Sequence, residues 1–128
     1  MFRYLAGVNV SNEVDRIISD VNDYHSLCQM ASQGSVIVNC VGPYEFYGEA
    51  VIRACLAEGT SYVDISGELQ FLERMQALYN EEAEKKHVYI VGACGFDSLP
   101  ADCGVVYLQQ RFQGSFQITL TLTLVLYN

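Results

Sequence analysis

The residues Val36-Ile-Val-Asn-Cys-Val-Gly-Pro-Tyr44 predict a buried β-strand that stops at a sharp corner. The apolar run over residues 35–40 is nearly continuous, which is typical of a parallel strand covered on both faces. Gly42 and Pro43 then end the strand, because proline lacks the backbone N–H that a β-ladder needs. A helix over residues 48–58 is expected after this corner, with Gly59 at its C-terminal cap.

Two further stretches repeat the pattern of a strand followed by glycine and a polar residue. They read Tyr62-Val-Asp-Ile-Ser-Gly-Glu68 and Val88-Tyr-Ile-Val-Gly-Ala-Cys-Gly-Phe-Asp97. Helices are expected over residues 69–86 and from Pro100 to residue 112. Three such strand–helix units predict an α/β fold, a doubly wound parallel sheet with right-handed crossovers. Ligands bind these sheets outside the carboxyl ends of the strands, so we expect a ligand at that edge.

Local patterns add detail to these elements. Residues 14–20 predict a short strand, and residues 24–32 predict a short helix. The i,i+4 pair of Glu49 and Arg53 is expected to stabilise its helix. Ser66 and Gly67 are expected to start the helix that follows them. The side chains of that helix expected to face the sheet are Phe71, Leu72, Met75, Leu78 and Tyr79.

The last residues of the chain change the period of the hydrophobic pattern. From Phe116 to Tyr127, apolar residues alternate with a second set that is rich in threonine, which predicts a β-strand. A strand of this length needs a partner. We therefore expect residues 1–113 to form one domain and residues 114–128 to begin a second, sheet-containing domain.

The composition indicates a globular protein, since 51% of the 128 residues are hydrophobic and 17% are charged. The net charge is −8 and lysine and arginine form no stripe, so nucleic acid and anionic membrane surfaces are not expected partners. The five cysteines show no metal-ligand spacing, which predicts reduced thiols in a cytosol-like compartment and no metal site. We also expect no signal peptide and no transmembrane segment, because no apolar stretch is long enough.

Residues at the ends of the predicted strands leave two interpretations open. Gly42 could let a cofactor approach the backbone while Pro43 stiffens the corner, or the corner could be a turn without a ligand. Asp64 and Glu68 could carry out acid–base chemistry or hold a hydroxyl. The pattern favours the alternative, in which Glu68 complements a helix N-terminus and Asp64 caps a turn. Three aromatic residues after the first corner could stack on a ligand or pack over the sheet edge: Tyr44, Phe46 and Tyr47.

The loop over residues 92–98 contains a cysteine between two glycines. A nucleophilic Cys94 would need a histidine base. His25 lies near a predicted helix start, and His87 immediately precedes a strand, which places it at the opposite edge of a parallel sheet. The pattern therefore favours a loop whose backbone supports a bound ring or chain over a thiol enzyme.

Together these motifs resemble the saccharopine dehydrogenase-like oxidoreductases, a branch of the saccharopine dehydrogenase and reductase family. The resemblance covers residues 14–114 and rests on four stretches: Val38-Asn-Cys-Val-Gly-Pro-Tyr44, Phe46-Tyr-Gly-Glu49, Asp64-Ile-Ser-Gly-Glu68 and Gly95-Phe-Asp-Ser-Leu-Pro-Ala-Asp102. It implies a Rossmann domain that binds NAD or NADP, followed by an α+β domain for substrate binding and dimerisation. The implied activity is nicotinamide-dependent hydride transfer.

The same resemblance implies positions for the cofactor. Asp20 would lie near the adenine. Four residues would run along the dinucleotide: Cys40, Val41, Gly42 and Pro43. Four others would border the nicotinamide: Cys94, Gly95, Phe96 and Asp97. The resemblance identifies no catalytic residue and no substrate, and it implies a cytoplasmic protein or one associated with lipid droplets or membranes.

The chain departs from the family pattern in two respects. It has no G-x-G-x-x-G loop, since Tyr4-Leu-Ala-Gly7 is no substitute, so the first βαβ unit is expected to be missing. The second domain stops within its first strand. We therefore expect an incomplete chain that is inactive or impaired as an oxidoreductase. The alternative is a non-catalytic module that forms a homo-oligomer by adding its C-terminal strand to a partner sheet.

Overall fold

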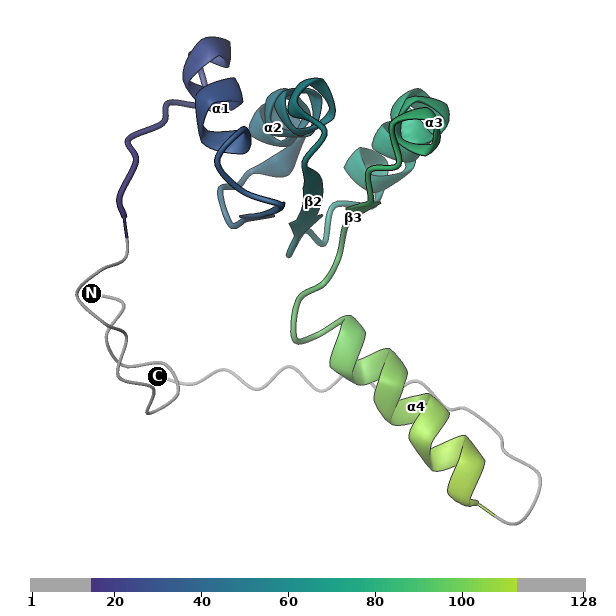
Figure 1. The fold of residues 1–128 in the computed structure, drawn as a ribbon. Helices are drawn as coiled ribbons and strands as arrows, with labels where there is room; N and C mark the ends of the chain where they lie inside the picture. The colour runs from purple at the N-terminus through teal and green to yellow at the C-terminus, as the bar shows by residue number, and fades with distance from the viewer. Residues whose placement is uncertain (1–14, 113–128) are drawn as a thin grey trace, which may run out of the picture. The chain divides into compact units, whose positions relative to one another are not determined.

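The computed structural model describes residues 15–112, which contain seven helices and strands (Figure 1). In chain order they are α1 (Tyr24–Ala31), β1 (Val36–Asn39), α2 (Tyr44–Glu58), β2 (Ser61–Asp64), α3 (Leu69–Lys86), β3 (Ile90–Val91) and α4 (Leu99–Arg111). The chain divides into two compact units, the first ending at Cys94 and the second beginning at Gly95. The first unit holds α1 to β3, and the second holds α4.

The three strands of the first unit form a parallel sheet in the order β1-β2-β3. Val36 pairs with Ser61, and Tyr62 pairs with Ile90, so the strands end beside one another at the same edge. This arrangement confirms the predicted α/β class and the partial Rossmann-like sheet. The predicted strand after residue 114 lies outside the described residues, and the predicted domain boundary stays a prediction.

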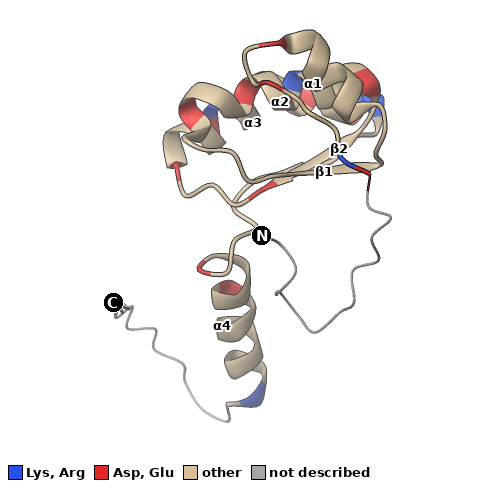
Figure 2. Cartoon of the chain, turned by 90° about the vertical axis from the view of Figure 1, so that its left-hand side faces the viewer, with Lys and Arg blue, Asp and Glu red and all other residues tan. Residues whose placement is uncertain are grey.

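The core of the first unit lies between the sheet and its helices. Figures 1 and 2 show α1, α2 and α3 over one face of the sheet. The largest fully buried side chains of this unit include Tyr62, Phe71, Ile52, Leu56 and Cys55. These residues come from β2, α2 and α3, so the period-2 strand pattern and the period-3.6 helix patterns meet in one core.

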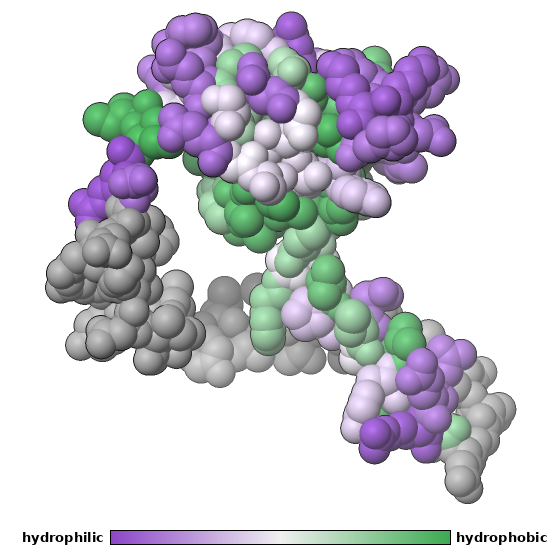
Figure 3. Space-filling view, viewed as in Figure 1, coloured by the Kyte–Doolittle hydropathy of each residue, from purple (hydrophilic) through white to green (hydrophobic). Residues whose placement is uncertain are grey.

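The opposite face of the sheet is exposed in the first unit, which corrects the expectation of a strand covered on both faces. Val36 and Val38 of β1 are 53% and 64% exposed. Val38, Val63 and Val91 are aligned by the strand register and form an apolar row across this face. Figure 3 shows hydrophobic surface in green on the lower side of the first unit. Right-handed crossovers between strands taken in consecutive order place both crossover helices on the same side, so α2 and α3 leave this face uncovered.

One predicted strand and one predicted helix start are wrong. Residues 15–20 contain no strand, because no described strand lies beside them to supply ladder hydrogen bonds. The Asp20 N–H instead bonds the Ser26 hydroxyl at 3.0 Å, in a turn before α1. The helix expected from residue 48 begins at Tyr44, because a carboxylate from elsewhere in the chain binds its first N–H groups. The predicted helix over residues 69–86 is confirmed at both ends.

Two predicted side-chain contacts are also wrong. Glu49 pairs with Arg74 at 3.4 Å rather than with Arg53. The Arg53 guanidinium instead lies over the Tyr24 ring, 5.3 Å from its centroid. Leu78 is 58% exposed, because the buried residues of α3 follow an i,i+4 row and Leu78 lies beside that row: Phe71, Met75 and Ala83.

Candidate functional site

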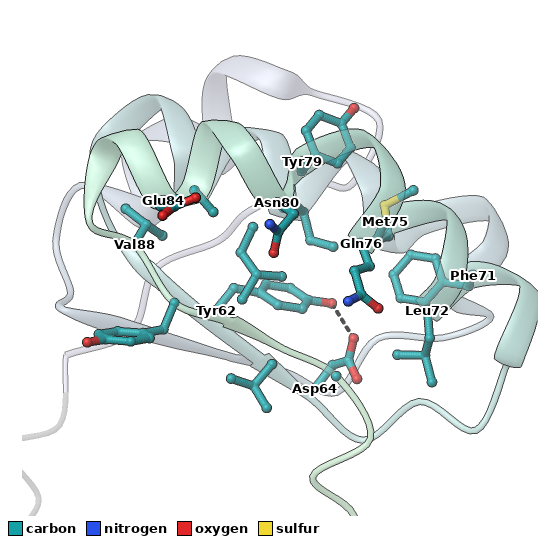
Figure 4. Close-up of a pocket in the computed structure, with 16 residues that line it drawn as sticks. Tyr62, Asp64, Phe71, Leu72, Met75, Gln76, Tyr79, Asn80, Glu84 and Val88 are labelled. Atoms are coloured by element: carbon teal, nitrogen blue, oxygen red, sulfur yellow. Dashed lines mark hydrogen bonds between the residues drawn. The ribbon is translucent and has the colours of Figure 1, made fainter.

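The candidate site is the carboxyl edge of the sheet, where β1, β2 and β3 end side by side. A buried chain of hydrogen bonds joins the strand ends. The Asn39 side-chain amide donates to the Tyr62 hydroxyl at 3.1 Å, and that hydroxyl donates to Asp64 Oδ2 at 2.9 Å (Figure 4). Asn39 and Tyr62 were not predicted as site residues, although polar groups at regular positions in apolar strands are the signal that marks them.

The corner after β1 is folded around Asn39. The Asn39 side-chain oxygen accepts from the Val41 N–H at 3.0 Å, and the Asn39 carbonyl accepts from the Tyr44 hydroxyl at 3.0 Å. Cys40, Val41, Gly42 and Pro43 are all exposed, and the bond between Gly42 and Pro43 is cis. A Cβ at Gly42 would lie 3.5 Å from the Tyr44 ring, which is an ordinary contact. Packing within the chain therefore does not require glycine at this position.

Glu68 binds the N-terminus of α2 across the sheet edge. Its two carboxylate oxygens accept from the N–H groups of Tyr44 and Glu45, each at 2.8 Å. The N-cap residue of α2, Pro43, offers no side-chain hydrogen bond. The expectation that Glu68 complements a helix N-terminus is confirmed, but the helix is α2 rather than the adjacent α3. These N–H groups are consequently occupied by an internal anion.

Asp64 ties the end of β3 to the end of β2. Its Oδ1 accepts from the Ala93 N–H at 2.9 Å, and its carbonyl accepts from the Cys94 N–H at 2.8 Å. The same Oδ1 accepts from the Ser66 N–H and hydroxyl at 3.0 and 2.8 Å. The prediction that Ser66 starts α3 is therefore wrong, because Ser66 belongs to a turn that Asp64 closes. The interpretation of Asp64 as the cap of a turn is confirmed.

The Cys94 thiol lies beside two backbone carbonyl groups. Its thiol donates toward the carbonyl oxygens of Val91 at 3.5 Å and Gly92 at 3.7 Å. His87 ends α3 and precedes β3, so it lies at the opposite end of that strand. Carbonyl oxygens cannot remove the thiol proton, and this geometry gives a thiol enzyme no support.

The remaining predicted site residues lie in two other places. Gly95 belongs to the second unit, where its carbonyl accepts from the N–H groups of Ser98 and Leu99 at the start of α4. Phe96, which is 88% exposed, and Asp97 lie in this same turn. Asp20 lies in the turn before α1, where its Oδ1 accepts from the Asn22 backbone and side chain at 2.9 and 3.0 Å. The cofactor contacts assigned to these residues stay predictions.

A groove between α3 and the sheet opens beside the buried network (Figure 4). Its volume is about 700 Å³, and Tyr62 and Asp64 lie on its floor while Phe71, Leu72 and Met75 form its wall. A Cβ at Gly92 would collide with Leu72, so glycine lets β3 pass close to α3. The sequence showed no signal of this groove.

The carboxylates of Asp64 and Glu68 accept hydrogen bonds from other groups of the chain rather than forming ion pairs among the described residues. Asp and Glu are spread over α2, α3 and the loops in Figure 2, and none of the described ion pairs involves Asp64 or Glu68. No group of three His, Cys, Asp or Glu side chains among residues 15–112 could hold a metal ion. No described helix is long and apolar enough to cross a membrane. The site offers a ligand backbone groups and apolar surface rather than a free acid or base.

Comparison with known proteins points to one family. The family model described as saccharopine dehydrogenase NADP binding domain matches residues 5–91. The chain is 55% identical over 106 residues to the saccharopine dehydrogenase-like oxidoreductase of Bos taurus, covering 83% of this chain and 25% of that protein. It is 49% identical over 108 residues to the lipid droplet localized protein of Caenorhabditis elegans, covering 84% of this chain and 25% of that protein.

A plant relative is similar over a shorter stretch. The chain is 45% identical over 91 residues to a probable mitochondrial saccharopine dehydrogenase-like oxidoreductase of Arabidopsis thaliana, covering 71% of this chain and 20% of that protein. No solved structure matches the chain. The chain spans about a quarter of the length of the animal relatives. With the family match and the parallel sheet together, the chain belongs to the saccharopine dehydrogenase-like oxidoreductases and contains part of their NADP-binding domain.

Proposed function

We propose that the carboxyl edge of this sheet forms part of the site that holds a nicotinamide dinucleotide in an oxidoreductase. The observation that supports the proposal is the parallel alignment of three strand ends, with the exposed Gly42 corner on β1 and the Cys94 backbone on β3. Open parallel sheets bind nucleotides at this edge. The corner residues fit a dinucleotide, because the fold itself would tolerate a Cβ at Gly42 and its absence leaves the exposed backbone open to a ligand.

The residues of this chain would hold and orient the dinucleotide, which supplies or accepts the hydride. Gly42 would let the backbone approach it closely, while Cys40, Val41 and Pro43 would line it with apolar surface. The backbone at Cys94 would border the nicotinamide end. Hydride transfer depends mainly on holding cofactor and substrate in reactive geometry, and no acid or base from this chain is assigned to it.

We propose further that this chain by itself binds the cofactor weakly and is inactive or impaired. The 128 residues contain no G-x-G-x-x-G loop. The N–H groups at the start of α2 are already occupied by Glu68, so they do not serve as a substitute anchor for the pyrophosphate. The family description names NADP, and NADPH is therefore the first ligand to test, with NADH for comparison.

A nuclear magnetic resonance titration of the chain with NADPH tests the proposal. We expect backbone amide shifts at Cys40, Val41, Gly42 and Cys94 and a dissociation constant above about 10 μM, or −6.8 kcal/mol. Gly42→Ala should fold normally and lose most of these shifts. The matched control is Gly34→Ala, which precedes β1 at the opposite edge, and whose Cβ would also make only ordinary contacts, from 3.6 Å.

Three results would count against the proposal. Shifts confined to residues away from the strand ends would contradict the location of the site. Equal binding by Gly42→Ala and wild type would contradict the role of the corner. Tight, saturable binding below about 10 μM would contradict the proposed impairment.

A second candidate function is a non-catalytic module that self-associates through residues 116–128, which lie outside the described residues. The exposed apolar face of the sheet, with Val36 and Val38, favours some assembly of this chain. Size-exclusion chromatography with light scattering should show a larger species for the full chain than for a chain ending at residue 115. An unchanged oligomeric state after truncation would contradict this candidate.

We also propose that the protein is cytoplasmic or associated with lipid droplets. The name of the nematode relative supports lipid droplets, whereas the name of the plant relative points to mitochondria. Density-gradient fractionation of a lysate from cells that express the chain separates lipid droplets, cytosol and mitochondria. Lipid droplets float to the top of the gradient, mitochondria sediment and cytosolic protein stays in the loading fractions. Recovery with mitochondria would contradict the proposal.

A further inference from the structure

The Asp64 carboxylate is buried at the centre of the sheet edge without a basic partner. Asp64 is 1% exposed, and none of the ion pairs formed by residues 15–112 involves it. It accepts four hydrogen bonds, three on Oδ1 and one on Oδ2. All four partners donate to it, two of them backbone N–H groups and two of them hydroxyls. A buried carboxyl group held only by neutral donors has a specific geometry.

The direction of the network is set by Tyr62. Burial raises the pKa of the Tyr62 phenol far above its ordinary value, so the phenol keeps its proton. Its oxygen accepts from the Asn39 amide, and its proton is therefore directed to Asp64. The other end of the Asn39 amide accepts from the Val41 N–H at the Gly42 corner. One chain of hydrogen bonds thus connects the corner after β1 with the carboxylate at the end of β2.

The same carboxylate fixes the backbone after β3. Ala93 has a φ of 55°, in the left-handed region that residues with a Cβ rarely adopt. Its N–H is bonded to Asp64 Oδ1, and the next N–H, of Cys94, is bonded to the Asp64 carbonyl. Two adjacent N–H groups held by one residue explain why the chain keeps this conformation at the strand exit.

We propose that Asp64 is the positioning residue of the dinucleotide site: it holds the Ala93–Cys94 backbone in place relative to the Gly42 corner. This inference rests on the proposed function, since it gives Asp64 no contact with the cofactor and lets it act through the two strand exits. It also assigns a role to a buried acid that the hydride transfer itself does not use. The competing explanation is that Asp64 serves only the stability of the fold.

Asp64→Asn tests the proposal because it conserves shape and removes the charge. An asparagine side chain has one acceptor oxygen, and its NH₂ group would face the Tyr62 hydroxyl, which already accepts from Asn39. The control is Leu27→Ala, which removes a buried side chain of α1, outside the network, and lowers global stability. Amide hydrogen exchange reports the local structure of each variant, and NADPH titration reports its binding.

In Asp64→Asn we expect the Ala93 amide to exchange at least about fivefold faster than in wild type, because its N–H then bonds a neutral amide oxygen in place of a carboxylate oxygen. NADPH affinity should fall at least about fivefold, since both strand exits contribute to one site. In Leu27→Ala the Ala93 resonance and the NADPH affinity should stay as in wild type. Loss of affinity in both variants would support a role in stability alone and overturn the proposal.

Unchanged exchange at Ala93 and Cys94 in a folded Asp64→Asn variant would also overturn it. If Asp64→Asn does not fold, Tyr62→Phe decides, because it leaves three donors on Asp64 and should still move the Ala93 and Val41 amide resonances. Unmoved resonances in Tyr62→Phe would overturn the proposal. If wild type shows no NADPH shifts, the proposed function fails separately, while Ala93 exchange still decides whether Asp64 positions this backbone.

Discussion

Replacing Glu68 should loosen the start of α2, although Glu68 lies 24 residues from Tyr44 in sequence. The two carboxylate oxygens bind two successive N–H groups of the first turn, each at 2.8 Å. The substitutions are Glu68→Ala, which removes both acceptors, and Glu68→Gln, which keeps one acceptor and removes the charge. The N-cap residue Pro43 offers no side-chain hydrogen bond, and no other side chain among the described residues caps this helix end.

The expected loss follows from these contacts. Removing a helix N-cap costs about 1 kcal/mol, with a range of roughly 0.5–2. The charge at the positive end of the helix dipole contributes about 0.3–1 kcal/mol more. Because Glu68 is half-buried and bonds two N–H groups, we expect a loss of about 2 kcal/mol for Glu68→Ala and about 1 for Glu68→Gln.

Urea denaturation followed by circular dichroism measures both losses. The control is Glu81→Gln on α3, since the Glu81 side chain is 87% exposed and its only ion pair within residues 15–112 is with Lys85 at 3.6 Å. Exposed pairs of this kind contribute little, so the control should lose less than about 0.5 kcal/mol. Amide exchange should also accelerate at Tyr44 and Glu45 in Glu68→Ala and not in the control.

A loss for Glu68→Ala no larger than that of Glu81→Gln would refute the reasoning. It would mean that water replaces the carboxylate at no cost and that the contact across the sheet edge does not hold the corner. A loss larger for Gln than for Ala would refute the assignment in another way, because it would show repulsion at the helix start rather than a missing cap.

Three further predictions follow from buried groups. Gly48→Ala should lose about 1–3 kcal/mol of the free energy of unfolding in urea denaturation, because its Cβ would lie 2.5 Å from the buried Phe71 ring. The control Gly67→Ala, whose Cβ would meet nothing within 4 Å, should change that free energy by less than about 0.5 kcal/mol. Equal losses would contradict the close packing of α2 on α3. Burial raises the pKa of Cys55 to about 11, so iodoacetamide at pH 8 should leave Cys55 unmodified while the exposed Cys40 and Cys103 react, as mass spectrometry can check. Burial and the hydrogen bond to Glu49 raise the pKa of Tyr79 from 10.0 to about 12, so the phenol ionises at lower pH in the unfolded chain than in the folded one. The stability that Tyr79 contributes is therefore complete below pH 10 and is lost as the pH rises toward 12. The free energy of unfolding of Tyr79→Phe, measured by urea denaturation, should fall less steeply over this range than that of wild type.

The strands and helices were predictable because each has a period that needs only neighbouring residues. The α3 bounds match the predicted ones, and α4 begins beside Pro100 as its fixed φ allows. The predicted boundary at the start of α2 failed because its cap comes from Glu68, and no local pattern reports a partner 24 residues away. The prediction for residues 15–20 failed because a strand exists only beside another strand.

The site was partly predictable for the same reason. The parallel order of the strands followed from the strand–helix spacing, and it placed the exits of β1, β2 and β3 at one edge. Asn39 and Tyr62 were missed as site residues because a polar group within an apolar strand does not by itself show which residues it contacts. Their importance arises from the register, which brings Asn39, Tyr62 and Asp64 together beneath the helices.

Local chemistry along the chain was sufficient for the class of fold, the family motifs and the edge of the sheet where we propose that a ligand binds. Those properties depend on backbone preferences and on periodic hydrophobicity, which a linear sequence carries in full. Which acids are engaged, which helix Glu68 caps and which face of the sheet stays bare depend on contacts between distant residues. Such contacts form only when the whole sheet is assembled, because a hydrogen bond depends on distance in space rather than on separation along the chain.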